Sequence, residues 1–327
     1  MKTVKRVLVA GGAGYIGSVL VRLLLKQNYK VRVLDSLLFG GESIVELLND
    51  PDFEFIKGDV RDENIVKIAL KDIDVLVNLA AIVGDPACAK QPDLAKETNF
   101  EASKTMYQIA NSMGVDRFIF ASTCSNYGKM DDPFSYVHEG SKLAPVSLYA
   151  ETKVATENFL LGQPKENKCK PTCLRFSTVY GLSPRMRFDL TVNEFTKELA
   201  LDRELVIFGE QFWRPYCHVI DLSRSVIAVI EAQDEKVAFN VFNVGSTDEN
   251  YTKKMLVDEI VKQLPDSKVK YVQRNDDPRD YKVTFKKIED TLGFKITRTV
   301  PEEITMIIKV VKEGFFNNPD ADKFKNC

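Results

Sequence analysis

The chain has 327 residues, of which 44% are hydrophobic and 28% are charged, and its formal net charge is −2. This composition excludes a collagen, a coiled coil and a disordered chain, and the length allows a large core and two lobes. The near-neutral charge gives no reason to expect a nucleic acid or an anionic membrane as partner, and no apolar run approaches the ~20 residues of a membrane span. We therefore expect a cytoplasmic globular protein, with no signal peptide before its first strand.

A glycine-rich turn follows the first predicted strand, residues 6–10, and opens a predicted helix over residues 15–26. Glycines at such a turn let the backbone approach a pyrophosphate closely, and the free N–H groups of a helix N-terminus favour its negative charge. A strand, a glycine turn and a helix in this order predict a dinucleotide site rather than an ordinary turn. The turn residues expected to contact the dinucleotide are Gly11, Gly14, Tyr15, Ile16 and Gly17.

The second predicted strand, residues 30–34, leads into Asp35, which stands 18 residues after Gly17. An acidic side chain about 20 residues past the glycine turn binds the adenosine ribose in folds of this kind. Residues 36–38 contain no Arg or Lys, and a carboxylate at this place would repel a 2′-phosphate. We therefore expect NAD, rather than NADP, as the cofactor.

Strands and helices alternate through the first half of the chain, which predicts an α/β fold with a doubly wound parallel sheet of the Rossmann type. Further strands are expected at residues 53–57, 75–79, 118–121 and 172–176. Long helices are expected between them, over residues 94–113 and 147–161. Ligands should then bind at the carboxyl ends of the strands.

Beyond residue 176 the irregular stretches, such as residues 177–189 and 209–217, become longer. Helices remain expected over residues 190–200, 222–232, 253–264 and 302–311. We expect a dinucleotide-binding domain over residues 1–176, joined by a returning segment near residues 236–246. Residues 177–327 should form mainly a smaller, substrate-binding C-terminal lobe.

Tyr149 and Lys153 stand four residues apart in the predicted helix 147–161 and so share one helical face. The Lys153 ammonium and a positively charged nicotinamide would both favour the tyrosinate, so we expect a lowered pKa for Tyr149 and an acid–base role. A surface pair on a helix is the alternative, since Tyr-x-x-x-Lys alone is a weak motif. The six cysteines and two histidines include no Cys-x-x-Cys pair, and we expect no metal site.

The ordered set of motifs resembles the nucleotide-sugar epimerase/dehydratase family, a group of the extended short-chain dehydrogenases/reductases. Besides the glycine turn and Tyr149 with Lys153, the resemblance rests on residues 58–61, 78–81, 175–181, 214–222 and 277–280. It implies bound NAD, a nucleoside-diphosphate sugar as substrate, and a homodimer formed through helices 94–113 and 147–161. The further cofactor contacts that it implies are Asp59, Val60, Leu79, Ala80, Ala81, Asn99 and Lys153.

The resemblance also implies which residues meet the substrate. Arg214 and Arg279 correspond to arginines that bind the sugar nucleotide's diphosphate, a role that suits the paired hydrogen bonds of a guanidinium. Thr178 replaces the familiar asparagine of the sugar pocket, and Thr123 corresponds to the residue that hydrogen-bonds a sugar hydroxyl.

Cys124 and Ser125 bear on the type of reaction. Sugar 4,6-dehydratases carry Asp-Glu at these two positions, because the removal of water needs an acid and a base. In 3,5-epimerases and related reductases a cysteine occupies the position of Ser125, so Cys124 is one residue away from that pattern. A catalytic thiol at Cys124 and a buried, inert one both remain open.

The expected reaction is NAD-dependent epimerisation at C4 of a nucleotide sugar through a transient 4-keto sugar, for which Tyr149, Lys153 and Thr123 suffice. The enzyme alternatives are a nucleotide 4-keto-sugar reductase, a 3,5-epimerase/reductase that uses Cys124 and, less favoured, a 4,6-dehydratase. Outside the enzymes, the alternative is a sensor of NAD or of a sugar nucleotide.

Overall fold

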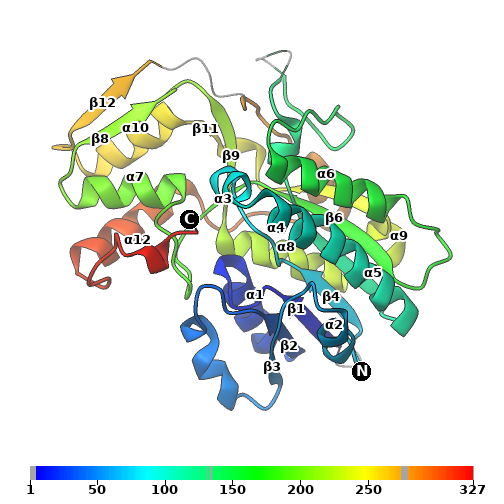
Figure 1. Cartoon of the computed structure of the whole chain (residues 1–327). Coiled ribbons are helices and arrows are strands. Elements are labelled where there is room, and N and C mark those ends of the chain that lie inside the picture. The colour runs from blue at the N-terminus through cyan, green and yellow to red at the C-terminus, as the bar shows by residue number, and fades with distance from the viewer. Residues whose placement is uncertain (1–4, 131, 133–134, 274–278, 327) are drawn as a thin grey trace.

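Seven parallel strands form the central sheet of the structure, a computed structural model that describes residues 5–130, 132, 135–273 and 279–326. Their order across the sheet is β10-β6-β5-β4-β1-β2-β3, so the winding direction reverses between β1 and β4 (Figure 1). The strands are β1 (Arg6–Ala10), β2 (Lys30–Asp35), β3 (Phe53–Lys57), β4 (Val75–Asn78), β5 (Arg117–Thr123), β6 (Lys170–Phe176) and β10 (Asn240–Val244). The doubly wound α/β fold expected from the sequence is confirmed, and the reversal point is where such sheets bind ligands.

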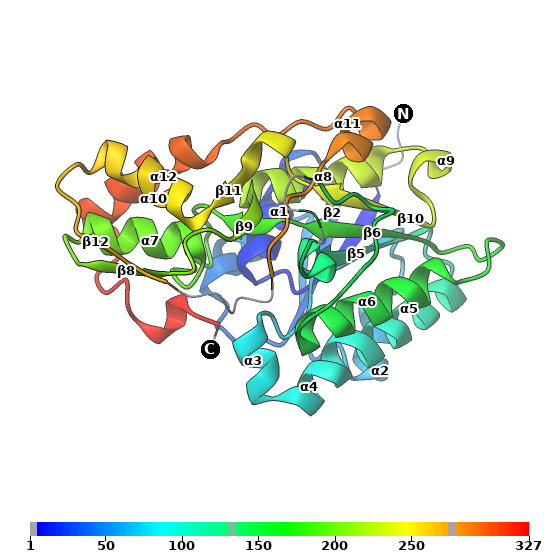
Figure 2. The same cartoon turned by 90° about the horizontal axis from the view of Figure 1, so that it is seen from above.

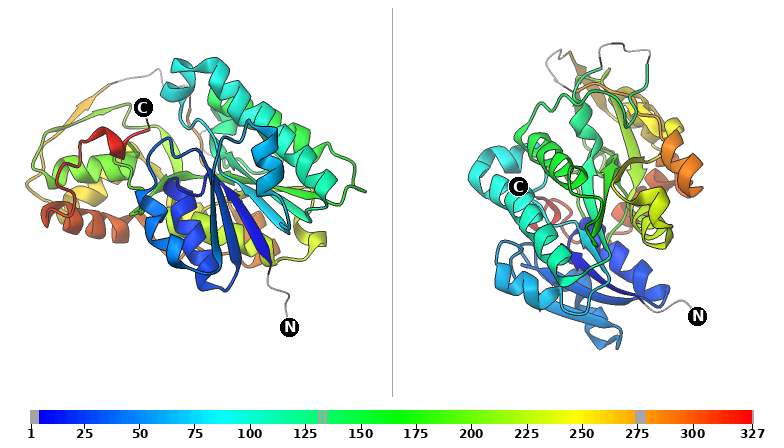
Figure 3. Two further views of the ribbon diagram at one scale, coloured as in Figure 1. Left: turned by 60° about the horizontal axis from the view of Figure 1, so that its bottom comes forward. Right: turned by 90° about the vertical axis from the view of Figure 1, so that its right-hand side faces the viewer.

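Helices cover both faces of this sheet, as Figures 2 and 3 show. Along β1, Val7 and Val9 enter one buried cluster while Leu8 and Ala10 enter another, because successive side chains of a strand point to opposite faces. The helices that complete the first cluster are α1 (Tyr15–Lys26) and α8 (Val219–Glu231). Those that complete the second are α2 (Glu63–Ala69), α5 (Ala102–Met113) and α6 (Leu148–Leu161). A sheet covered on both faces meets its ligands at the strand ends.

The helix expected over residues 94–113 is interrupted in the structure. A short α3 (Asp85–Lys90) and α4 (Pro92–Lys96) come first, and a π-helical segment over Glu97–Glu101 then leads into α5. The i→i+5 bonds of a single π-helical turn leave no mark on hydrophobic periodicity, so the sequence pattern could not reveal this segment.

The second half of the chain contributes to the main sheet and also builds two smaller sheets. β10 pairs with β6, from Asn240 with Thr172 to Val244 with Phe176. One small sheet contains β11 (Asn250–Thr252), β9 (Trp213–His218) and β7 (Thr178–Tyr180), and the other contains β12 (Val269–Val272) and β8 (Leu205–Phe208). The stretches expected to be irregular therefore include β7 and most of β9, short strands without a clear alternation of apolar and polar residues.

Three helices pack around the small sheets within two residues of the expected bounds: α7 (Thr191–Ala200), α10 (Lys253–Gln263) and α12 (Val300–Lys312). α8 begins three residues earlier than expected. Shorter helices and 3-10 turns that the sequence pattern did not reveal are α9 (Asp234–Val237), α11 (Lys286–Leu292), Glu42–Asn49, Cys124–Tyr127, Thr247–Glu249 and Asp322–Phe324. In the described parts of the chain, no helix has the length and apolar character needed to cross a membrane.

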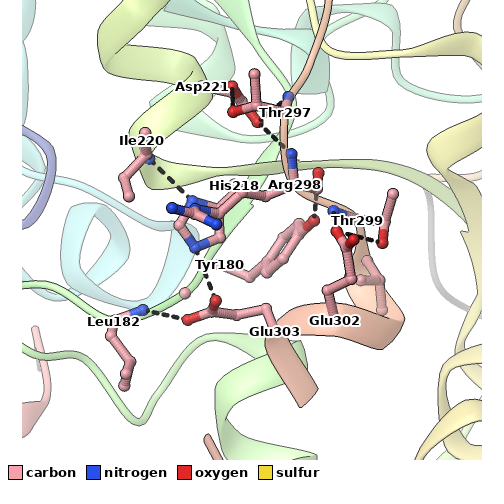
Figure 4. A network of polar contacts seen from close by, with 12 residues as sticks. Tyr180, Leu182, His218, Ile220, Asp221, Thr297, Arg298, Thr299, Glu302 and Glu303 are labelled. Carbon is pink, nitrogen blue, oxygen red and sulfur yellow. Dashed lines mark hydrogen bonds and ion pairs between the residues drawn. The ribbon is translucent and has the colours of Figure 1, made fainter. Parts of the chain in front are cut away.

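A buried polar network ties α12 to α8 and to the loop after β7 (Figure 4). The Asp221 carboxylate is fully buried and accepts hydrogen bonds from the backbone of Thr297 and Arg298, at 2.9 and 3.0 Å. Nε2 of His218 faces Oε2 of Glu303 at 3.1 Å, and the other Glu303 oxygen accepts the N–H of Leu182 at 2.8 Å. These contacts fix the start of the loop over residues 182–189, which reaches the functional site.

We predict that Asp221→Ala lowers the free energy of unfolding by about 2–4 kcal/mol, because it removes the buried carboxylate that accepts the N–H groups of Thr297 and Arg298 and the Thr297 hydroxyl. The measurement is urea unfolding followed by circular dichroism. The control is Arg224→Ala, which removes the half-exposed ion-pair partner of Asp221 and should cost less than about 1 kcal/mol. Equal losses in the two variants would contradict this reasoning.

Candidate active site

A cavity of about 330 Å³ lies at the carboxyl ends of the central strands. The glycine turn after β1, the end of β2, the segment after β4 and the end of β5 all contribute to its lining. Most residues named from the sequence line it: Gly11, Gly14, Tyr15, Ile16, Gly17, Asp35, Asp59, Val60, Leu79, Ala80, Ala81, Thr123, Tyr149 and Lys153. The structure thus brings the expected cofactor residues and the expected acid–base pair to one site.

The glycine turn leaves its backbone accessible at the N-terminus of α1. Gly11 has a φ of +83°, and a Cβ atom at Gly17 would lie 2.2 Å from the Gly11 carbonyl oxygen, so both positions require glycine. The N-cap residue Gly14 supplies no side-chain cap, and the first turn of α1 contains no acidic residue. The positive end of the helix is therefore open to an anionic group, and these residues fit the pyrophosphate of a dinucleotide.

Asp35 connects this turn to the end of β2. Its carboxylate accepts the N–H of Ala13 at 3.0 Å and the N–H of Leu37 at 2.8 Å. Burial raises the pKa of Asp35, while the two backbone donors oppose that rise. The carboxylate is thereby held in place at the cavity wall.

Tyr149 and Lys153 project from the first turns of α6, which Ser147 caps by accepting the N–H of Ala150. The buried Lys153 ammonium donates to the Ala121 carbonyl at 2.7 Å and lies 5.8 Å from the centre of the Tyr149 ring. Burial lowers the pKa of Lys153 to about 8. The pKa of Tyr149 is raised, so the lowered pKa expected from the sequence is wrong. The effect of burial on this phenol outweighs that of the neighbouring charges.

A buried ion pair sets the position of α6. Glu157 lies one turn beyond Lys153 on the same helical face, and Glu157 and Arg175 of β6 are 1% and 4% exposed. The Arg175 guanidinium donates to both Glu157 oxygens, with Nε–Oε1 at 3.0 Å and Nη2–Oε2 at 2.7 Å. Ser122, at the end of β5, and Asn126 also donate to the Glu157 carboxylate. The pair therefore joins α6 to the ends of β5 and β6 beneath the cavity.

Cys124 and Ser125 lie outside the cavity lining. Cys124 is 1% exposed and packs in the core, where its thiol donates to the Arg175 carbonyl at 3.2 Å. Burial raises its pKa, so a thiolate is disfavoured. The hydroxyl of Ser125 lies 3.4 Å from that of Tyr281. The alternative in which Cys124 exchanges protons with a substrate loses its geometric basis, because the chain turns at the end of β5 and directs the thiol inward.

Asn99 stands behind the cavity wall rather than in it. From the π-helical segment, its side chain accepts the N–H of Ile82 at 2.8 Å and donates to the carbonyl of Ile82 at 3.0 Å. Ile82 itself lines the cavity. Asn99 therefore holds the segment after β4 in place and does not itself face a ligand there.

The expected substrate residues also lie outside the cavity lining. Thr178 opens β7 and is half-buried. Arg214 donates to the carbonyls of Trp213 and Arg279, at 2.6 and 2.5 Å, and Arg279 forms an ion pair with Asp85 at 2.9 Å. The structure thus places the two arginines side by side, while residues 277 and 278 of the same motif fall outside the described residues.

A family model described as the NAD dependent epimerase/dehydratase family matches residues 7–245. The chain belongs to this family. The resemblance to extended short-chain dehydrogenases/reductases is thereby confirmed, and the protein is an enzyme whose cofactor is NAD.

Relatives within the family carry out more than one reaction. The chain is 29% identical over 313 residues to the UDP-glucose 4-epimerase of Lactobacillus helveticus, covering 89% of this chain and 92% of that one. It is 30% identical over 275 residues to the UDP-N-acetyl-alpha-D-glucosaminuronate decarboxylase of Bacillus cytotoxicus, covering 82% and 83%. The crystal structure of UDP-glucuronic acid 4-epimerase from Bacillus cereus, in complex with UDP-glucuronic acid and NAD, matches with a TM-score of 0.83 and 26% identity, covering 94% and 99%.

Several residues that line the cavity were not identified from the sequence motifs. Arg185 and Arg187 enter the cavity from the loop after β7, Phe39 from the loop after β2, and Asn326 from the far end of the described chain. The Arg-Met-Arg run at residues 185–187 was the available signal, within a stretch already noted as irregular. Asn326 has no local signal, because its place in the wall depends on long-range packing.

We predict that Arg175→Met lowers the free energy of unfolding of this epimerase/dehydratase-family protein by about 3–5 kcal/mol, because it leaves the buried Glu157 carboxylate uncompensated. The double variant with Glu157→Leu removes both charges and should lose less than Arg175→Met alone. Chemical unfolding of the parent, the two single variants and the double variant measures the difference. A double variant that loses the sum of the two single losses would refute the pairing argument.

We predict that Lys153→Met is more stable than the parent protein at pH 7 by about 1–3 kcal/mol, because burial of the ammonium disfavours the folded state. The folded protein releases the Lys153 proton near pH 8, before the unfolded chain does, so this group adds stability as the pH rises from about 8 to about 10.5. The variant should lack that rise. Urea unfolding at pH 7 and pH 10 measures it, with the exposed Lys67→Met as a control that keeps the parent's pH dependence.

Proposed function

We propose that the protein is a nucleotide-sugar 4-epimerase that works through a transient 4-keto sugar. The observation that carries the proposal is that Tyr149, Lys153 and Thr123 line the cavity, whereas the next two positions hold a thiol turned into the core, at Cys124, and a hydroxyl, at Ser125. A 4,6-dehydratase would need an acid and a base from the latter two positions. The similarity to UDP-glucose 4-epimerase from Lactobacillus helveticus supports the same reaction.

In the proposed reaction Tyr149 takes the proton of the sugar hydroxyl at C4 and later returns it. When bound, NAD supplies the hydride chemistry that interconverts the alcohol and the ketone. Lys153 stabilises the Tyr149 phenolate, and burial makes this help necessary because it raises the pKa of that phenol. Thr123, buried at the end of β5, orients the sugar by a hydrogen bond. C4 would be inverted if the 4-keto sugar turns over in the site before it is reduced, with Tyr149 returning the proton to its oxygen.

We further propose that the C-terminal lobe binds a nucleoside-diphosphate sugar, with the division at residues 176 and 177 expected from the sequence. Arg214 and Arg279 lie next to each other, as a diphosphate site requires, and Arg279 would exchange Asp85 for phosphate oxygens. Thr178 stands at the start of β7 near the sugar in this arrangement. A homodimer formed through α5 and α6, and a cytoplasmic location, also stay proposals.

The experiment that tests the function is a panel of UDP-, GDP-, CDP- and dTDP-linked sugars incubated with the NAD-loaded enzyme. Formation of a C4 isomer, identified by nuclear magnetic resonance, with no net change in NADH absorbance is the expected result. Stoichiometric consumption of NADH would instead assign a 4-keto-sugar reductase. Bound cofactor without turnover of any sugar would assign a sensor.

We predict that Tyr149→Phe lowers kcat by about 10²-fold or more, because the ring keeps its packing but loses the group that exchanges the proton. NAD binding should change little, which separates the loss of chemistry from the loss of the site. Tyr136→Phe, at an exposed tyrosine, is the matched control and should keep full activity. A Tyr149→Phe enzyme within a few-fold of the parent would remove the acid–base role.

A further inference from the structure

Two buried arginines face the cavity from the loop over residues 182–189. Arg185 and Arg187 are 6% and 8% exposed. Arg187 donates to both oxygens of Asp189, at 2.9 and 2.7 Å, so its charge is compensated. Arg185 forms no ion pair among the residues that the structure describes. It donates to the side-chain oxygen of Asn326 at 2.7 Å and to the carbonyl of Lys325 at 2.8 Å.

Arg185 is thus a buried cation held by neutral groups. Its guanidinium stacks on the Phe39 ring, with 4.0 Å between the guanidinium carbon and the ring centre. Within the described part of the chain its buried Nε has no hydrogen-bond acceptor. Burial lowers the pKa of Arg185 to about 10. Among the described residues the carboxylate that acts on Arg185 is that of Asp189, which is already paired with Arg187. A buried charge that is only partly compensated is costly, so this arrangement fits an anion that comes from outside the protein.

The loop that carries Arg185 is fastened to the positive end of α1. The hydroxyl of Ser183 donates to the carbonyl of Tyr15 at 2.7 Å and lies 3.2 Å from that of Ser18. The hydroxyl of Tyr15 donates to the carbonyl of Gly181. Arg185 therefore faces the cavity between the uncapped N-terminus of α1 and the Phe39 loop that follows Asp35.

The segment over residues 316–326 holds Arg185 in this place. Figure 1 shows it, in red, turning back from α12 toward the middle of the molecule. Asp320 pairs with Lys197 at 2.6 Å, the ring of Phe324 packs edge-on against that of Phe188, and the N–H of Asn326 donates to Asp189 at 3.1 Å. Asn326, the last residue of this segment, lines the cavity.

We propose that Arg185, stacked on Phe39 and oriented by Lys325 and Asn326, binds the pyrophosphate of NAD, so that the segment over residues 316–326 forms the outer wall of the cofactor site. The helix N-terminus and the guanidinium then hold the pyrophosphate from two sides. A guanidinium forms charge-assisted hydrogen bonds with phosphate oxygens, and the two sets of donors act on one anion. The cofactor is released slowly as a result.

The test is isothermal titration of the full chain, freed of NAD, with NAD, adenosine and UDP as separate ligands. Arg185→Gln should weaken NAD binding by at least about tenfold, since it removes a charge-assisted contact. Adenosine, which lacks the pyrophosphate, and UDP, which carries the substrate's diphosphate, should bind as before. Lys323→Ala removes an exposed charge from the same segment and serves as the control with unchanged NAD affinity.

A second variant, Asn326→Asp, tests the proposal in case Arg185→Gln does not fold. Its carboxylate would pair with Arg185, so it should raise the thermal midpoint measured without NAD and weaken NAD binding together. NAD affinity within twofold of the parent in the folded variants overturns the proposal. A loss confined to UDP also overturns it, because it assigns Arg185 to the substrate's diphosphate. An equal loss for adenosine does the same, because adenosine lacks the pyrophosphate.

Discussion

The bidentate ion pair between Glu157 and Arg175 decides where α6 lies on the central sheet, and the chemistry of the cavity depends on that position. Tyr149, Lys153 and Glu157 follow one another at intervals of four residues on one face of α6. Fixing Glu157 at one end of this row therefore also orients Tyr149 at the other end. The ion pair is buried, and its carboxylate accepts further hydrogen bonds from Ser122 and Asn126, which favours a single geometry. A hydrophobic contact at the same place would hold the helix against the sheet and still let it rotate or slide.

Electrostatic compensation differs between the two ends of the cavity. At the acid–base end, Lys153 is held by a backbone carbonyl and by the face of Phe120, 4.6 Å from the ring centre, so part of its charge is stabilised without a carboxylate. At the other end, Asp35 uses two backbone donors and Asp59 pairs with Arg61, which lowers the pKa of Asp59. Lys153, Asp35 and Asp59 thus differ in the kind of group that compensates their charge.

The parts of the site that local sequence reveals are those carried by a strand end and the few residues after it. The glycine turn, Asp35, residues 79–81 and the Tyr149–Lys153 pair are of this kind, because strand periodicity and turn chemistry act over a handful of residues. The orientation of Cys124 was not accessible in this way, since a 3-10 turn begins directly at the end of β5 and cancels the alternation of faces. Arg185 and Asn326 were missed for a different reason: their contact joins residues 141 positions apart, and no pattern in either segment indicates the other.

The lining of the cavity has a consequence for folding. Gly11 and Asn326 contribute to the same wall although most of the chain separates them. The loop after β7, α8 and the residues after α12 must therefore reach their places before the site is complete. A ligand that requires the complete wall stabilises the native state by mass action against global unfolding, because any opening of either end of the chain releases it. A bound ligand then makes the two halves of the chain unfold together. Hydrogen exchange in β1 and in the segment that ends at residue 326 should slow together when the ligand is bound.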